Sequence, residues 1–508
     1  MKTMRQPASA TSNLLTFSRS RGRAVLLFWT VLTSIGTAWF LFDERAFWFL
    51  AGSIACFTIS LPLAVGQRDY EIASPWTLLL LGGYLAFGLR GLFISLGIEA
   101  DRTLDDLYFL GHQPGYFYRP TAVFLIGLAM LTLGYIGAPR PRRHPRVGTR
   151  PHLSPTAVQL VVPLCAAVGF AAFLLYAQST GGLGLGQISA KRTTISGAEL
   201  DSSYQSHGGL RVINTFSSLA FWIQTAYYCY RRTPHGITTP QFWWLAVLFG
   251  NAALLPLYAS TRSDLIYIVI GALLIELSLR KSSLNIRTLG AATALILVIG
   301  GAMTSLRSSA TATSQTAQVN AETVIGGFVL SRTIADVATT SHIVRAVPQA
   351  LPYANGETIT SWLAAPIPRS VWPSKPIVSV GPEIGRVVYG NKRAGVPPGV
   401  VGESYWNFGF VGVLFIPLLA GMALRRLQET WGPFASSSPE AAIILAIVAV
   451  RPGLAIISNS VGYVLFQVVQ SLVLLLPLLL LIGRSEPAVE RKRSTAQRSS
   501  VRVGLSNR

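Results

Sequence analysis

The chain has 508 residues, of which 51% are hydrophobic and only 12% are charged, and its formal net charge is +21. A soluble globular protein carries about 25% charged residues, so the composition excludes an ordinary soluble domain. Apolar runs of about twenty residues, the length that a helix needs to cross a bilayer, recur from Ala24 to Ile482. The sequence therefore predicts an all-α polytopic membrane protein.

A net charge this positive would point to nucleic acid in a soluble protein. Here the Lys and Arg residues cluster in short segments beside the apolar runs, as in Arg231-Arg232 and Arg425-Arg426. That placement sets the orientation of membrane helices and attracts anionic lipid headgroups. We expect membrane lipids as partners, and no nucleic acid.

The apolar runs predict twelve spans. The first run follows a basic segment like that of a signal peptide, but it is long and has no small-residue cleavage site, so it is interpreted as an uncleaved span. An even number of spans places both termini on one side, and the basic connections fall on that same side. This predicts a multi-pass protein of the cell inner (cytoplasmic) membrane with both termini cytoplasmic. The predicted spans are 24–42, 46–65, 75–98, 120–138, 155–177, 211–230, 241–259, 264–280, 288–306, 405–424, 439–457 and 461–482.

These spans divide the chain into five parts. Residues 1–23 form a basic cytoplasmic N-terminus, and 24–306 hold the first nine helices, with an extracytoplasmic loop at 178–210. Residues 307–404 form a large extracytoplasmic loop, 405–482 hold the last three helices, and 483–508 form a disordered basic tail. A loop as long as 307–404 is expected to contain short helices of its own.

Two arginines, Arg90 and Arg451, lie inside apolar spans. An ionised Arg in hydrocarbon costs at least ~2.5 kcal/mol, so it normally faces a cavity or a charged partner. Pro452 and Gly453 are expected to break the helix after Arg451 and to open such a cavity. The alternative is a purely structural pair or an Arg that reaches the membrane interface.

The segment Ser260–Asp264 joins two spans by a very short turn. Arg262 at headgroup depth could grip a diphosphate with its forked donors, or it could simply anchor the helix at the interface. Ser263 or Asp264 suits the N-cap of the span that follows, and this capping role is sufficient to explain Asp264.

The large loop is strongly basic and, from Pro366 to Gly412, rich in Gly and Pro. The excess of cations predicts an anion site to which glycine-rich backbone could approach closely. A solvated basic surface is the alternative. The cations are Arg307, Arg332, Arg345, Arg369, Lys375, Arg386, Lys392 and Arg393.

Glu403, in Gly402-Glu403-Ser404, is the carboxylate most suited to chemistry, because it lies where the loop meets a span. Beside cations it could deprotonate a sugar hydroxyl. The alternative is an acid at the N-terminus of its own helix, favoured by the helix dipole. Glu383 is the second candidate.

No cofactor or metal is expected. The six histidines are scattered, and the three cysteines, Cys56, Cys165 and Cys229, lie within apolar runs. Neither set has the spacing of a metal site or of a disulfide framework. Arg and Lys can stabilise a diphosphate leaving group in place of Mg²⁺.

The arrangement resembles the oligosaccharide repeat-unit polymerases, the Wzy-type O-antigen polymerases. The resemblance rests on about a dozen spans, on a Gly-Gly-containing loop before the sixth span and on a large loop before the third-last span. Its specific part is Pro366–Arg369, Trp372–Pro376 and the run from Pro398 to Gly412, with Gly402-Glu403-Ser404 and Asn407-Phe408-Gly409. Some members carry an Arg with a Gly eleven positions on in each of two loops. Here Arg369 reaches Gly381 one residue late, and Arg192 has no clean match.

The resemblance implies a GT-C-like glycosyltransferase that polymerises undecaprenyl-diphosphate-linked repeat units into O-antigen, capsular or exopolysaccharide at the outer face of the membrane. Together with the charges noted above, it predicts Glu403 and Arg369 as catalytic residues, with Glu403 as the general base or as the group that orients the acceptor hydroxyl, and Arg90 and Arg451 as lining of the cavity. A chain-length regulator and a flippase are candidate partners. Arg262, Arg369, Lys375, Arg386 and Arg393 are expected to hold the diphosphate and stabilise it as it leaves, and Arg192 and Glu383 are expected to bind the substrate.

Two other functions remain open. A flippase for lipid-linked saccharides also needs buried arginines and a cavity, but it would be expected to show two matching halves. An O-antigen-ligase-like transferase would use the same donor with another acceptor.

Overall fold

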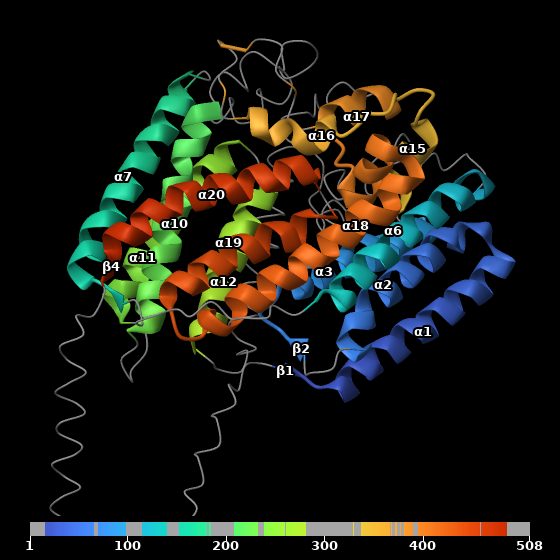
Figure 1. The fold of residues 1–508 in the computed structure, drawn as a ribbon, viewed down its shortest axis with the longest axis horizontal. Coiled ribbons are helices and arrows are strands. Elements are labelled where there is room, and N and C mark those ends of the chain that lie inside the picture. The colour runs from blue at the N-terminus through green and yellow to red at the C-terminus, as the bar shows by residue number, and fades with distance from the viewer. Residues whose placement is uncertain are drawn as a thin grey trace, which may run out of the picture.

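The structure is a computed structural model, and the part of the chain that it describes is almost entirely helical (Figure 1). Two antiparallel pairs of two-residue strands complete it: β1 (Thr16–Phe17) with β2 (Tyr70–Glu71), and β3 (His152–Leu153) with β4 (Gly483–Arg484). The described residues are 16–65, 70–97, 114–139, 152–179, 182–183, 208–231, 238–259, 261–280, 329, 337–365, 367, 371–372, 376, 380–389, 395–457 and 459–484.

The helices up to residue 280 follow the predicted spans closely. The third predicted span is one continuous rod in which a π-helical segment joins two α-helical ones. The elements are α1 (Arg19–Phe42), η1 (Glu44–Ala46), α2 (Phe47–Val65), α3 (Pro75–Gly83), η2 (Tyr84–Leu89), α4 (Arg90–Ser95), η3 (Pro114–Phe117), α6 (Tyr118–Gly137), α7 (Pro155–Ser179), α10 (Gly208–Tyr230), α11 (Thr239–Tyr258) and α12 (Arg262–Arg280).

The large loop contains short helices, as predicted. They are α15 (Val337–Ala346), α16 (Glu357–Thr360), η5 (Ser361–Ala364) and α17 (Gly381–Val388). Three long helices follow: α18 (Gly399–Ala435), α19 (Pro439–Ala455) and α20 (Val461–Ile482). α18 begins at Gly399, so its first residues fall within the predicted loop 307–404.

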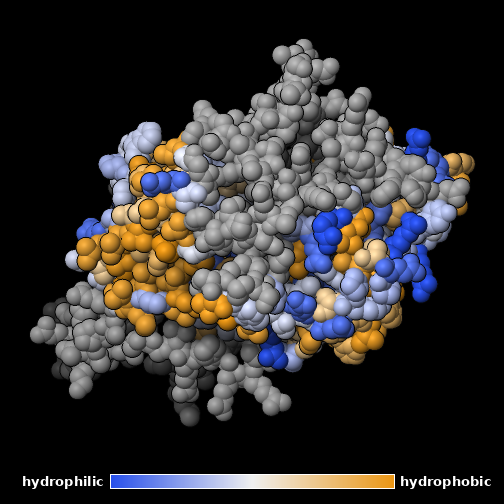
Figure 2. All heavy atoms as spheres, turned by 90° about the horizontal axis from the view of Figure 1, so that it is seen from above, coloured by the Kyte–Doolittle hydropathy of each residue, from blue (hydrophilic) through white to orange (hydrophobic). Residues whose placement is uncertain are grey.

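Eight of the described helices are long and apolar enough to cross a membrane, which confirms a helical membrane protein. Large apolar side chains such as Leu41, Leu160 and Leu480 lie exposed on their outer faces, and Figure 2 shows apolar side chains over the flanks of the molecule. Lipid is the solvent that such faces require. The eight are 19–42, 44–65, 75–95, 115–137, 155–179, 239–258, 399–435 and 461–482.

Three further predicted spans, 211–230, 264–280 and 439–457, are the helices α10, α12 and α19, which are not among these eight. The predicted span 288–306 lies outside the described residues. Nearly every residue of α19 is buried, and α19 packs against α3, α10, α12, α18 and α20. A helix that is apolar all round suits such a central position.

The described ends of the chain are held by the two short strand pairs. In Figure 1, β1 and β2 lie along the lower margin and β4 lies at the left edge, whereas α15, α16 and α17 lie in the upper part. The pairing of β1 with β2 ties the segment before α1 to the segment before α3, and the pairing of β3 with β4 ties the residues after α20 to the segment before α7. Gly483 and Arg484, predicted to begin a disordered tail, are therefore part of the fold.

α18 is interrupted one third of the way along. Phe408 and Gly409 leave helical geometry, and Gly409 has a φ of +59°, a conformation that favours glycine. A Cβ at Gly409 would also lie 3.2 Å from the Tyr353 hydroxyl. The kink separates a first part, 399–407, which packs with the loop helices, from the membrane-spanning remainder.

Two glycines allow the backbones of α6 and α18 to touch. A Cβ on Gly134 would lie 2.0 Å from the carbonyl oxygen of Leu418, and a Cβ on Gly421 would lie 2.0 Å from that of Leu131. Small residues permit such close crossings of membrane helices.

We predict that Gly134→Ala destabilises the protein by about 1–3 kcal/mol, because the added methyl group must push α6 and α18 apart. The measurement is the thermal unfolding midpoint of the purified protein in detergent. Gly137→Ala is the matched control on the same helix, since a Cβ there meets nothing within 4 Å. Equal midpoints for the two variants would contradict the packing argument.

Candidate functional site

A cavity of about 1120 Å³ lies between α10, α11, α12, α19 and α20, with η5 beside it. Its lining comes from most of the N-terminal part of α10 (208–222) and α20 (463–474), from the first turns of α12 and from the last turns of α11 and α19. The cavity therefore lies toward the end of the helical layer at which α10, α12 and α20 begin. That end is the one next to the loop helices, because Trp362 and Leu363 of η5 also line it.

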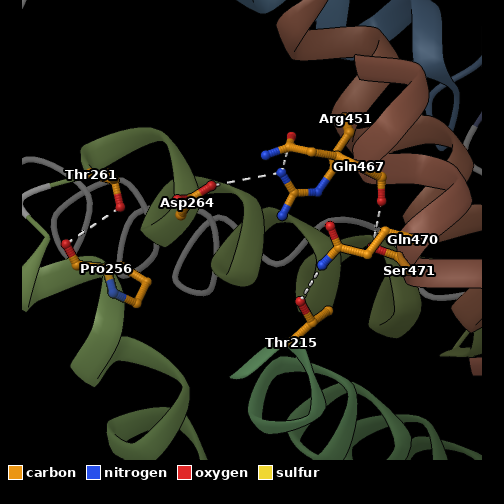
Figure 3. A network of polar contacts seen from close by, with 8 residues as sticks. All are labelled: Thr215, Pro256, Thr261, Asp264, Arg451, Gln467, Gln470 and Ser471. Atoms are coloured by element: carbon orange, nitrogen blue, oxygen red, sulfur yellow. Dashed lines mark hydrogen bonds and ion pairs between the residues drawn. The ribbon is translucent and has the colours of Figure 1, made fainter. Parts of the chain in front are cut away.

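Arg451 of α19 is the central cation of this cavity, and side chains from two other helices, α12 and α20, hold it (Figure 3). Its Nη1 donates to Oε1 of Gln467 on α20, and the same nitrogen lies 3.6 Å from Oδ1 of Asp264 on α12. The guanidinium carbon lies 4.9 Å from the centre of the Tyr267 ring. These three interactions stabilise the Arg451 guanidinium and fix its position, as an ionised arginine inside an apolar helix requires.

The predicted helix break after Arg451 is wrong. α19 continues through Pro452 and Gly453 to Ala455, and the Ile456 amide donates to the Pro452 carbonyl at 3.1 Å. Gly453 instead permits a close approach, because a Cβ there would lie 2.5 Å from the Pro75 carbonyl oxygen of α3. The cavity arises from how the helices are spaced around α19.

The lining changes from polar to apolar along the helices. Near the loop helices it presents Arg451, Asp264 and Gln467, and Nε2 of Gln470 donates to Oγ1 of Thr215 at 2.8 Å, which joins α20 to α10. Farther from the loop helices the lining is apolar, with Leu219, Trp222, Val473 and Leu474.

The cavity also reaches the outer surface. Ile213 of α10 and Val469 and Val473 of α20 line it, yet 38%, 39% and 61% of their surfaces are exposed. An opening between α10 and α20 thus meets the flank where lipid would lie. A polar head at one end, an apolar depth and a lateral opening together suit an amphiphile with an anionic headgroup.

The sequence-predicted cations are distributed unevenly. Arg451 lines the cavity, and Arg262 begins α12, the helix that contributes Asp264. Arg90 is fully buried elsewhere, where its Nη1 donates to the Val329 carbonyl at 2.9 Å. Arg90 does not line this cavity, contrary to the expectation that it joins Arg451 there. Arg192, Arg369, Lys375 and Arg393 lie outside the described residues.

Glu383 and Arg386 both lie on α17, and neither lines the cavity. Desolvation raises the pKa of the Glu383 carboxyl above its ordinary value, and the Arg386 guanidinium opposes that shift. Nothing in the described geometry joins this pair to Arg451.

Glu403 is fully buried in the first part of α18, and it does not line the cavity. Its Oε2 accepts from the backbone N–H of Val461, the first residue of α20. The carboxylate therefore satisfies the N-terminus of α20, a position that favours negative charge. The sequence alternatives were a base or an acid of its own helix. The structure shows a third role, in which Glu403 ties α18 to a different helix.

Asn407 extends this connection. Its Nδ2 donates to the Glu403 carbonyl at 2.8 Å and to Oγ1 of Thr358 at 2.7 Å, and its Oδ1 accepts from the Gly356 amide at 2.8 Å. The Glu403 and Asn407 motifs singled out in the sequence thus hold the loop helices, α18 and α20 together.

From the sequence, Asp264 is predicted to be only a helix cap. α12 begins at Arg262, so Asp264 lies inside the first turn, and its carboxylate faces Arg451. It is the one acidic side chain among the described residues that line the cavity. The sequence contained no indication of this pairing, because 187 positions along the chain separate the two residues.

Within the described ranges, no group of three His, Cys, Asp or Glu side chains is placed to hold a metal ion. The charged lining of the cavity instead consists of Arg211, Asp264 and Arg451.

Comparison with known proteins yields no match. No family model matches the chain, and neither does any curated protein or solved structure.

We predict that Glu403→Ala destabilises the protein by about 1–3 kcal/mol, since it leaves the partly buried Val461 N–H without this acceptor. Glu403→Gln is the matched variant, because its amide oxygen can still accept from Val461. It should unfold at nearly the wild-type temperature in detergent. Equal losses in the two variants would show that the negative charge, and not the acceptor, is what α20 needs.

Proposed function

We propose that the chain is a membrane glycosyltransferase that polymerises undecaprenyl-diphosphate-linked oligosaccharide repeat units into O-antigen, capsular or exopolysaccharide. The observation that carries the proposal is the one-sided amphipathic cavity with Arg451 at its polar end. The motif resemblance in the loop points to the same substrate. In this proposal the protein has twelve spans in a GT-C-like arrangement, and the loop helices lie at the outer face of the cytoplasmic membrane.

The cavity suits each part of such a donor. Arg451 is preorganised by Gln467 and Tyr267, and its planar donors match phosphate oxygens. The apolar depth suits a polyprenyl chain, and the opening between α10 and α20 would let that chain reach the cavity from lipid. The oligosaccharide would extend toward the loop helices, where Trp362 lines the rim and could stack on a sugar face.

In the reaction, an acceptor hydroxyl attacks the anomeric carbon of the donor, and the bond from that carbon to the diphosphate breaks. The electron pair leaves with the diphosphate oxygen. Arg451 stabilises the charge that develops there, in a site from which bulk water is largely excluded. Arg262 and the loop cations Arg369, Lys375 and Arg393 are proposed to add to this field, whereas Arg386 on α17 lies apart from the cavity.

A one-sided cavity bears on the flippase alternative. Transport across the membrane requires access from both faces in turn, whereas the lining of α20 begins at Tyr463 and ends at Leu474, short of its end at Ile482. A flippase in its outward-open state would show the same asymmetry, so the two functions are separated by the experiment below. An O-antigen-ligase-like transferase would use the same cavity with another acceptor.

We predict that Arg451→Gln lowers the formation of long polymer by about 10²-fold, the size of loss expected when a donor to a developing anion is removed. The measurement is the chain-length profile in a host that lacks the native gene, with protein levels matched. Arg425→Gln is the control, because Arg425 pairs with Glu429 on α18 and does not line the cavity.

Three outcomes separate the functions. Translocated single repeat units that accumulate in the Arg451→Gln cells support a polymerase. Units retained on the cytoplasmic face would indicate a flippase. Long chains at the wild-type level would remove Arg451 from the site.

A further inference from the structure

The cavity contains a carboxylate and a guanidinium that face each other without a tight bond. Asp264 Oδ1 and Arg451 Nη1 are 3.6 Å apart, which is beyond hydrogen-bond distance, and Nη1 donates instead to Gln467. The two side chains keep 24% and 17% of their surface exposed. Their attraction is therefore electrostatic, and each group remains accessible from the cavity.

We propose that Asp264 is the catalytic base of the transfer, and that the donor's diphosphate activates it by taking over Arg451. This assignment rests on the function proposed above. It replaces Glu403 as the base, because Glu403 is fully buried and already accepts from the N-terminus of α20.

The activation follows from simple electrostatics. In the empty cavity the Arg451 guanidinium faces the Asp264 carboxylate at 3.6 Å. An anion bound to Arg451 takes up the donors of that guanidinium, so the Asp264 carboxylate is left to accept the proton of an acceptor hydroxyl. The base would thus become effective only when the donor is in place.

The surroundings of Asp264 support this role. The other described titratable groups of the lining are Arg211 on α10, Tyr267 on α12, Arg451 on α19 and Tyr463 on α20. None of them is a second carboxylate or a histidine, so no other group in this set is an evident base near neutral pH. Trp362 and Leu363 of η5 also line the cavity, which leaves room for an acceptor to enter from the loop helices.

The proton balance is complete with these groups. The acceptor hydroxyl gives its proton to an Asp264 oxygen as its own oxygen bonds to the anomeric carbon. The bond from that carbon to the diphosphate oxygen breaks, and the diphosphate leaves with the electron pair, held by Arg451. After the products leave, Asp264 returns the proton to water and pairs with Arg451 again.

The test separates binding from transfer in the purified full-length protein in lipid nanodiscs. Binding is measured with undecaprenyl diphosphate. Transfer is measured with lipid-linked repeat units isolated from a host strain that lacks the native gene. Asp264→Asn should bind undecaprenyl diphosphate at least as tightly as the wild type, because a competing anion is gone. It should transfer about 10²–10⁴-fold more slowly, the usual contribution of a general base.

Two further variants complete the comparison. Arg451→Gln should lose binding as well as transfer. Glu276→Gln, the same substitution type on α12 but outside the cavity lining, should change neither. If Asp264→Asn unfolds, Asp264→Glu keeps the carboxylate and should retain part of the transfer rate.

The results that overturn the inference are distinct. Transfer by Asp264→Asn at the wild-type rate excludes Asp264 as the base. Weaker binding by Asp264→Asn shows that the carboxylate serves to hold Arg451 in place and does not compete with the anion. If the wild type binds undecaprenyl diphosphate but transfers nothing, the proposed function fails. In that case, tighter binding by Asp264→Asn would still establish the exchange of partners at Arg451.

Discussion

An ionised arginine within an apolar helix has to be satisfied, and the arrangement around Arg451 follows from that constraint. α12 contributes Asp264 and Tyr267 to it, and α20 contributes Gln467. α19 is buried on nearly all sides by the described helices, and its Arg451 is accessible from the cavity between them. A charged side chain is costly to bury in hydrocarbon, so Arg451 faces a cavity, and there an anion can bind it.

The cavity keeps its shape because α20 is held at both ends. At one end Glu403 accepts from Val461, and Val400 of α18 donates to the Ile456 carbonyl, just after α19. At the other end β4 pairs with β3, immediately before α7. Between these ends, the Gln470–Thr215 hydrogen bond joins α20 to α10. Both residues line the cavity, which lies beside this bond.

The loop helices depend on the first part of α18. Asn407 bonds the turn at Gly356 and Thr358, and the Trp406 indole donates to the Pro352 carbonyl at 2.9 Å. The kink at Gly409 then redirects the chain into the membrane-spanning part. The segment 352–358 is thus held to α18 by the side chains of Trp406 and Asn407, which bond its backbone at Pro352 and Gly356 and the Thr358 hydroxyl.

The sequence by itself determined the class of protein and most of its helices, because hydrocarbon demands long apolar runs and closed backbone hydrogen bonding. It also identified Arg451 and Glu403 as unusual, since a charge in or beside an apolar span is costly wherever the helix packs. Only the tertiary structure decided what each one faces. Arg90 and Arg451 look alike in sequence, yet one bonds a loop carbonyl and the other lines a cavity. From the sequence, Asp264 is predicted to be a helix cap and Glu403 a base. The packing of α12, α18, α19 and α20 shows that Asp264 faces Arg451 and that Glu403 accepts from Val461. Partners so far apart along the chain leave no local pattern, because helix packing alone brings them within reach.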